Sequence, residues 1–411
     1  MKTIILNQRK ERDLLLSRTY LTRHTRYDKQ EMLQSKQIKL ITGPRRTGKS
    51  TEALLMLQGK NFAYLNFDDA RLLSSWNEDL VMEMLGQIYP NYEYLLLDEV
   101  QNLPQWDLWV SKLYRLGVNM VITGSNAKLL SGEMATLLTG RYLQVEMLPF
   151  SLEEFFTWNG ICLSSSDDAK RTSLLDDYLH NGGYPETVAS RVLAQSYLST
   201  LFDSIVWKDV ARRYNVRHVD DLNNLAMYLL SNFCNAFSAN ELAEALGLSG
   251  VATVKKFMGY LHEPYLFYYL PRYNNKLKLM QKAPQKVYVV DNGFVSAKAF
   301  NLSDNAGRLL ENQVFVELLR RGYDEEKTLF YYRSRNDKET DFVTRHGNRI
   351  EKLIQVCYDL SSERTLKREV SSLVECATEL KCDDLYIVTM SEERVIEKNG
   401  FQIKVVPIYK F

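Results

Sequence analysis

Residues 41–57 read ITGPRRTGKSTEALLML, and this stretch decides the fold class of the N-terminal third of the chain. Within it, residues 43–50 match the pattern GxxxxGK[ST]. The apolar residues before the pattern predict a buried strand, and the residues after it have the spacing of an amphipathic helix that ends at Gly59. A strand, a glycine loop and a helix in this order form a cradle for phosphate groups, because glycines let backbone N–H groups turn toward phosphate oxygens at a helix N-terminus.

Two side chains of this loop have specific expected roles. We expect Lys49 to reach the β- and γ-phosphates of a nucleoside triphosphate and the Ser50 hydroxyl to bind Mg²⁺. A glycine turn that merely starts a helix is the alternative, and the strand and helix on either side disfavour it. The expected nucleotide-binding residues are Gly43, Pro44, Arg45, Arg46, Thr47, Gly48, Lys49, Ser50 and Thr51.

Two adjacent carboxylates follow the apolar residues 94–97, which we expect to form a strand. Ligands of open α/β sheets bind at the carboxyl ends of strands, so Asp98 is placed to hold Mg²⁺ through water. Glu99 is the candidate to accept a proton from the water that attacks the γ-phosphate. Acidic residues also end strands in solvent, but the phosphate loop upstream favours a catalytic pair.

Further strand-like segments at 61–69, 119–126 and 141–148 alternate with helical segments, which predicts a parallel αβα sandwich. Ser125 follows the fourth strand, where its hydroxyl would lie between the carboxylates and the γ-phosphate and sense hydrolysis. Gly-Ser-Asn is also an ordinary turn. Arg141 precedes the fifth strand and is a candidate arginine finger, in cis or from a neighbouring subunit. A surface arginine that closes a loop is the equally compatible alternative.

Five segments together resemble one family: GPRRTGKST, LLLDEVQNLPQW, ITGSNAKLL, the GRY segment and LPFSLEEF. They resemble bacterial and archaeal AAA-type P-loop ATPases of the additional-strand class that carry a C-terminal domain of unknown function (DUF4143-like), over nearly the whole chain. The resemblance implies binding and hydrolysis of ATP with Mg²⁺, and the Walker A and Walker B roles of the residues above. It favours Ser125 as the sensor and Arg141 as the finger. It also implies adenine as the base and the strand order 5-1-4-3-2.

Composition excludes several classes of protein. The 411 residues suggest two to four domains, and 25% charged with 45% hydrophobic residues is typical of globular proteins with a sizeable core. No stretch approaches the roughly 20 apolar residues of a membrane span, and the N-terminus lacks a signal-peptide core, so we expect a cytoplasmic protein without membrane contact. Five cysteines without ligand spacing indicate neither disulfides nor a zinc site. With a net charge of +1, nucleic-acid binding would need a local basic surface.

The remainder of the chain predicts three further parts. Residues 238–247 form a capped helix, a turn follows, and a second helix with Lys255 and Lys256 precedes an aromatic β segment, which is the order of a winged helix-turn-helix. Such a module binds DNA or serves only for packing. The predicted domains are a P-loop ATPase (1–160), a helical lid or connector (161–220), a winged helix-turn-helix (221–284) and an α/β restriction-endonuclease-like domain (285–411).

The last domain resembles the restriction-endonuclease-like fold in its order of a helix with Glu311, a strand with Asp341 and a further strand. Such nucleases need two or three acidic ligands for Mg²⁺ and a lysine beside the scissile phosphate. Gln355 stands where the last acid would be, and Cys357 where the lysine would be. We therefore expect a degenerate nuclease site used for binding or assembly. The alternative is an active DNA nuclease with a relocated lysine, such as Lys338 or Lys352.

The sequence thus predicts an ATPase that hydrolyses ATP with Mg²⁺ and passes a conformational change to a C-terminal DNA- or protein-binding region. Two classes stay open. An ATP-driven, DNA-associated machine would bind DNA through the winged helix and the last domain. A nucleotide-dependent scaffold or signalling switch would act on protein partners without DNA. An oligomer follows if Arg141 acts in trans.

Overall fold

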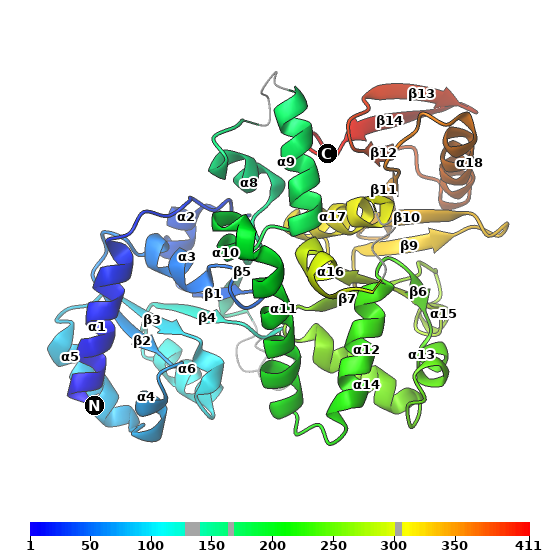
Figure 1. Cartoon of the computed structure of the whole chain (residues 1–411). Coiled ribbons are helices and arrows are strands. Elements are labelled where there is room, and N and C mark those ends of the chain that lie inside the picture. Colours follow the sequence, from blue (N-terminus) through cyan, green and yellow to red (C-terminus); the bar gives the residue numbers. More distant parts are fainter. Residues whose placement is uncertain (128–139, 163–167, 301–305) are drawn as a thin grey trace. The chain divides into compact units, whose positions relative to one another are not determined.

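The computed structural model of the chain describes residues 1–127, 140–162, 168–300 and 306–411 (Figure 1). These residues form two compact units. The first contains Met1–Leu148 and Glu263–Tyr265, and the second contains Pro149–His262 and Leu266–Phe411. In the described part of the chain, no helix is both long and apolar enough to cross a membrane. All five cysteines are free thiols.

The first unit is built on a five-stranded sheet in which every pair of neighbouring strands is parallel. Its strands are β1 (Ile38–Thr42), β2 (Phe62–Asn66), β3 (Tyr94–Asp98), β4 (Met120–Gly124) and β5 (Tyr142–Glu146). The spatial order is β2-β3-β4-β1-β5, so the implied order 5-1-4-3-2 is confirmed. Strands covered on both faces read as continuous apolar runs, which explains why this sheet could be found from sequence.

Helices cover both faces of this sheet (Figure 1). The core on one face combines Leu95 and Leu97 of β3 with side chains of α1, α5 and α6, whereas Leu96 packs on the other face with residues of α2 and α3. This alternation follows from the two-residue period of a strand. The predicted αβα sandwich is confirmed. The helices are α1 (Lys2–Leu16), α2 (Lys29–Gln34), α3 (Lys49–Met56), α4 (Ala70–Ser74), α5 (Glu78–Ile88), the 3₁₀ turn η1 (Val100–Asn102) and α6 (Trp106–Arg115).

The second unit begins with helices. They are α8 (Leu152–Trp158), α9 (Asp168–Asn181), α10 (Pro185–Ala189), η3 (Arg191–Leu193), α11 (Ala194–Ser204), the π-helix η4 (Ile205–Arg212) and α12 (Val219–Ser231). A tight turn between α9 and α10 carries Gly183, whose N–H donates to Asp291 over 2.8 Å and whose carbonyl accepts from Phe150 N over 2.7 Å. A Cβ at Gly183 would lie 2.4 Å from the Phe150 carbonyl oxygen, so this close approach of backbones requires glycine.

A small antiparallel sheet follows, in the order β6-β8-β7. Its elements along the chain are β6 (Ala236–Phe237), α13 (Ala239–Ala245), α14 (Val251–His262), β7 (Phe267–Pro271), α15 (Leu277–Met280), β8 (Gln285–Val289) and α16 (Asn292–Lys298). Ser238 caps α13 in a capping box with Glu241. The order of helices and strands agrees with the winged-helix prediction, which stays a prediction. The boundary drawn after residue 284 needs correction, because β8 pairs with β6 and β7 and belongs to this sheet.

The C-terminal part is a six-stranded mixed sheet in the order β13-β14-β12-β11-β10-β9. Its elements are α17 (Ala306–Arg320), β9 (Leu329–Arg333), β10 (Glu339–His346), β11 (Arg349–Val356), α18 (Glu363–Leu380), β12 (Leu385–Thr389), β13 (Arg394–Lys398) and β14 (Phe401–Pro407). The further strand expected after Asp341 is β11, which ends at Val356. Beyond it, the Asp359 carboxylate accepts from the N–H of Ser361, which is the local bond of a turn.

We expect Gly183→Ala to lower the thermal unfolding midpoint, because relieving a 2.4 Å contact with backbone costs about 1–3 kcal/mol, as overpacking generally does. The matched control is Gly259→Ala in α14, where a Cβ would meet open space and where alanine favours the helix by up to about 1 kcal/mol. Circular dichroism melts of both variants make the comparison. Equal midpoints would contradict the steric role of Gly183.

Candidate active site

The phosphate loop connects β1 to α3 at the carboxyl edge of the sheet, as its sequence predicts. Gly43 and Gly48 have φ angles of 135° and 92°, in the region that favours glycine. A Cβ at Gly43 would lie 2.4 Å from the Met147 carbonyl oxygen, so a larger residue does not fit there. Inside the loop, the Thr47 hydroxyl donates to the Pro44 carbonyl over 2.9 Å. This hydrogen bond stabilises the turn of the phosphate loop.

The remaining loop side chains differ in their exposure. Arg46 is exposed and has a left-handed backbone, and Arg45 is partly buried. Thr51 is partly buried in the first turn of α3. Lys49 is buried, and its Nζ donates to the Pro44 carbonyl over 2.8 Å and lies 3.8 Å from Glu99 Oε1. The lysine therefore lies between the loop and the second carboxylate of the pair.

Ser50 and Asp98, the two expected Mg²⁺-binding residues, contact each other directly. The Ser50 hydroxyl donates to Asp98 Oδ1 over 2.7 Å. Thr123 donates to the same oxygen, and the Tyr64 hydroxyl donates to Oδ2 over 3.1 Å. Burial raises the pKa of Asp98 to about 6, although these hydrogen bonds favour its ionised form. The hard oxygen donors of Ser50 and Asp98 fit Mg²⁺, which prefers such ligands.

Glu99 and Ser125 also meet. Glu99 has a left-handed backbone with φ 52°, and its N–H donates to Thr123 Oγ1 over 3.0 Å. Its Oε2 accepts from Gln101 Nε2 and, over 3.0 Å, from the Ser125 hydroxyl. Burial alone would raise the pKa of Glu99, but the Lys49 ammonium and these two hydrogen bonds together hold it below its ordinary value. Glu99 is thus an ionised carboxylate, the state that a proton acceptor needs.

Arg141 lies at the opposite edge of the sheet from the phosphate loop. It directly precedes β5, which runs parallel to β1, and Ile38 N donates to its carbonyl. Its guanidinium contacts Ser111 Oγ over 3.3 Å and lies over the Tyr114 ring, both in α6. Five strand residues, about 16 Å, separate the two edges. Arg141 thus lies away from the phosphate loop of its own chain, and its role as an arginine finger, in cis or in trans, stays a prediction.

Four contributors to this site were missed by the sequence analysis. Tyr64, Gln101 and Thr123 contact the carboxylate pair as described above. Arg23 is buried, with Nη1 donating to the Thr47 carbonyl and Nη2 to the Leu148 carbonyl, each over 2.7 Å. Thr123 lies at the end of β4, two residues before the predicted sensor Ser125, and this position could have identified it from the sequence. Arg23 lies in a polar segment without a recognisable pattern.

The predicted nuclease-like residues only partly converge. Glu311 and Asp341 both contact Lys286 Nζ. Cys357 lies beyond β11, its Sγ contacts the Asp359 carbonyl, and burial raises the pKa of its thiol to about 11. Gln355 is buried at the end of β11. Among the described residues, no group of three or more His, Cys, Asp or Glu side chains is arranged to hold a metal ion.

A third lysine, besides the two named as relocated candidates, contacts the expected acids. The Nζ of Lys352 lies 3.8 Å from Glu351 Oε1, and the Lys352 side chain is partly exposed. The backbone N–H of Lys338 donates to the Ser334 hydroxyl. The lysine that contacts both Glu311 and Asp341 is Lys286 of β8. It was missed because it precedes the helix and strands of the expected nuclease pattern.

Comparison with protein families divides the chain into three consecutive matches. A family described as an AAA domain matches residues 35–156. Two families described as domains of unknown function, DUF8612 and DUF4143, match residues 172–305 and 306–411. The first match includes both the phosphate loop and the carboxylate pair.

Two curated relatives share most of their length with this chain, and both are uncharacterized. A protein of Methanocaldococcus jannaschii is 32% identical over 395 residues, covering 91% of this chain and 88% of its own. A protein of Haemophilus influenzae is 32% identical over 353 residues, covering 80% and 86%.

Similar solved structures include a Walker-type ATPase of Pyrococcus abyssi, with 14% identity, a TM-score of 0.43 and coverage of 70% of this chain and 95% of that one. The replication initiator DnaA bound to AMPPCP and single-stranded DNA has 16% identity, a TM-score of 0.33 and coverage of 59% and 89%.

We expect Arg23→Met to weaken nucleotide binding about tenfold, since a buried hydrogen bond from a charged donor contributes about 1.5–3 kcal/mol and holds the Thr47 carbonyl in place. Arg26→Met is the control, because Arg26 is exposed beside Tyr27 in the same segment. Titration with a fluorescent ATP analogue measures both. Unchanged affinity in folded Arg23→Met would show that Arg23 does not position the loop.

Proposed function

Because the chain belongs to the family of AAA-type P-loop ATPases with a C-terminal domain of unknown function, we propose that it hydrolyses ATP with Mg²⁺ and couples hydrolysis to a conformational change in a C-terminal DNA- or protein-binding region. The observation that carries the proposal is the 2.7 Å bond between Ser50 and Asp98, with Glu99 and Lys49 beside it. A serine or threonine from the phosphate loop and an aspartate at the end of a strand are the pair that holds Mg²⁺ in P-loop enzymes.

The proposed mechanism assigns each group one task. Backbone N–H groups of residue 43 and residues 45–50 bind the phosphates, and Lys49 exchanges its bond to the Pro44 carbonyl for phosphate oxygens. Ser50 would bind Mg²⁺ directly and Asp98 would hold it through water, and the metal would supply positive charge to the phosphates. Glu99 accepts a proton from the attacking water, and Ser125 and Gln101 orient the Glu99 carboxylate.

The link from hydrolysis to movement begins at Ser125 in this proposal. Its hydroxyl donates to Glu99 over 3.0 Å, so a change in the charge or position of Glu99 alters this hydrogen bond next to the end of β4. Arg141 would complete the site of a neighbouring subunit, which makes the active species an oligomer. Its position at the far edge of its own sheet supports this trans role.

For the C-terminal region, the candidate DNA contact is α14. Lys255 and Lys256 are exposed on this helix, and Lys256 lies over the Tyr260 ring, which stacks on Tyr214 at 3.8 Å between centroids. An exposed basic helix beside stacked aromatic rings supports contact with a phosphate backbone. A scaffold or signalling switch that acts on protein partners is the alternative.

We expect Lys49→Ala to remove ATP binding and Glu99→Gln to retain binding while lowering the hydrolysis rate by about 100-fold or more, because a positioned proton acceptor contributes that factor. Lys60→Ala and Glu93→Gln are matched controls, since both residues are exposed in the same unit. Phosphate release and ATP-analogue titration separate the two effects. Normal hydrolysis in Glu99→Gln would contradict the assigned role of Glu99.

DNA should raise the hydrolysis rate of the wild type if the C-terminal region binds DNA. We expect the double variant Lys255→Glu, Lys256→Glu to lose this stimulation while keeping its basal rate, because reversed charge repels phosphates. The assay compares duplex and single-stranded DNA at two salt concentrations. Hydrolysis that ignores DNA in the wild type would favour the protein-partner switch.

A further inference from the structure

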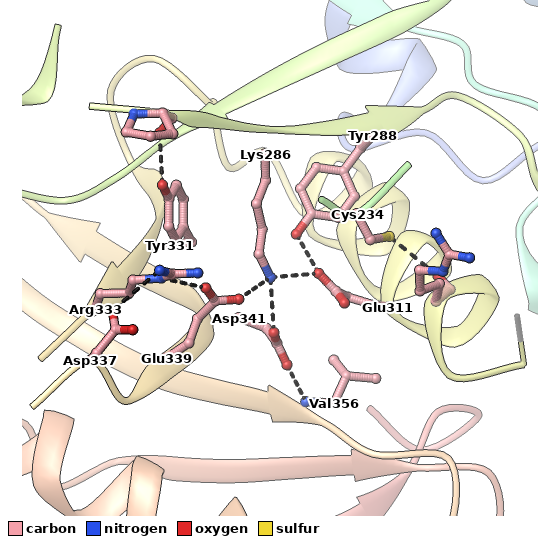
Figure 2. Close-up of polar contacts among 12 residues, drawn as sticks. Cys234, Lys286, Tyr288, Glu311, Tyr331, Arg333, Asp337, Glu339, Asp341 and Val356 are labelled. Atoms are coloured by element: carbon pink, nitrogen blue, oxygen red, sulfur yellow. Dashed lines mark hydrogen bonds and ion pairs between the residues drawn. The ribbon is translucent and has the colours of Figure 1, made fainter. Parts of the chain in front are cut away.

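A buried lysine stands at the centre of a carboxylate cluster in the second unit. Figure 2 shows Lys286 pointing into a group of acidic side chains that come from α17 and β10. Its Nζ lies 2.9 Å from Glu311 Oε1, 2.8 Å from Glu339 Oε1 and 3.0 Å from Asp341 Oδ1. Lys286 is only 2% exposed. An ammonium group has three protons, and each of them here has a carboxylate acceptor.

The surrounding groups hold the three carboxylates in this arrangement. Asp341 Oδ2 accepts from Val356 N over 2.9 Å, and Glu339 Oε2 accepts from Arg333 Nε over 2.9 Å. The Tyr288 hydroxyl donates to Glu311 Oε1 over 2.7 Å. Lys286 and Tyr288 are two residues apart in β8, so both side chains lie on the same face of that strand.

The negative charge of the three carboxylates requires a cation, and Lys286 supplies it. A buried carboxylate without a partner cation is costly, and three together also repel one another. Burial by itself would lower the pKa of Lys286, but Glu311, Asp341 and Glu339 raise it well above its usual value, so the ammonium is charged. The cluster therefore depends on a cation at the position of Nζ.

The geometry also distinguishes two roles for this lysine. A lysine that assists metal-dependent cleavage must leave carboxylate oxygens for the metal and point toward a substrate phosphate. Lys286 instead engages all three acids itself and is closed off from solvent. Glu311 and Asp341, the two acids expected for a metal, are both used by the ammonium.

We propose that Lys286 is the resident cation of this cluster: its ammonium occupies the point on which Glu311, Glu339 and Asp341 converge, excludes a divalent metal from it, and fastens β8 to α17 and β10. The ion cluster then joins the β6-β8-β7 sheet to the C-terminal part, at the place where a nuclease would bind Mg²⁺. The C-terminal part has no metal-dependent phosphodiester cleavage and serves for binding or assembly. This inference is independent of ATP hydrolysis in the first unit.

The test removes the lysine and offers a metal in its place. The full-length wild type, Lys286→Met and Lys286→Met with Asp341→Asn are titrated with Mn²⁺ without nucleotide, using electron paramagnetic resonance and thermal melts. We expect Lys286→Met to have a lower unfolding midpoint, to gain a Mn²⁺ site, and to recover its midpoint on adding Mn²⁺. The double variant should lose both effects. Lys282→Met, an exposed lysine just before β8, should behave as the wild type.

Two results would overturn the proposal. A folded Lys286→Met that neither loses stability nor binds Mn²⁺ would show that the cluster has no cation position. If Lys286→Met fails to fold, the wild type compared with Asp341→Asn still decides. A Mn²⁺ site, or cleavage of plasmid or single-stranded DNA with Mg²⁺ or Mn²⁺, that is present in the wild type and lost in Asp341→Asn would place the lysine beside a metal.

Discussion

The parallel alignment of five strands is the constraint on which the proposed ATPase site depends. Because all five run in one direction, the carboxyl ends of β1, β3 and β4 meet at one edge, and with them Ser50, Asp98, Glu99 and Ser125. The same constraint places Arg141 at the other edge, away from its own phosphate loop. Strand direction therefore brings the residues of the proposed site together and separates Arg141 from them.

Both units depend on cations placed among buried carboxylates. In the first, Lys49 lies 3.8 Å from Glu99 and helps to keep it ionised, and Asp98 is satisfied by hydroxyl donors, a set that fits Mg²⁺. In the second, Lys286 already saturates its acids. The difference in donor type gives the two clusters different proposed roles, one open to a metal and one closed to it.

The fold of the first unit could be predicted almost entirely because its signals are local. Buried parallel strands are apolar runs, and a glycine loop between a strand and a helix has a strict spacing. In the second unit, the capped helix α13 and the helix α17 were predictable for the same reason. The place of β8 in the small sheet could not be predicted, because the residues of β8 alone do not indicate that this strand pairs with β7.

The sequence by itself determined the phosphate loop and the carboxylate pair, and it shows that Gln355 and Cys357 are neither an acid nor a lysine, since residue identity and short spacing suffice for these. Only the tertiary structure decided which side chains complete the clusters. Arg23 reaches the loop from 24 residues upstream, and Lys286 meets Asp341 from 55 residues away. Such contacts arise when separate elements pack together, and no periodicity along the chain encodes them.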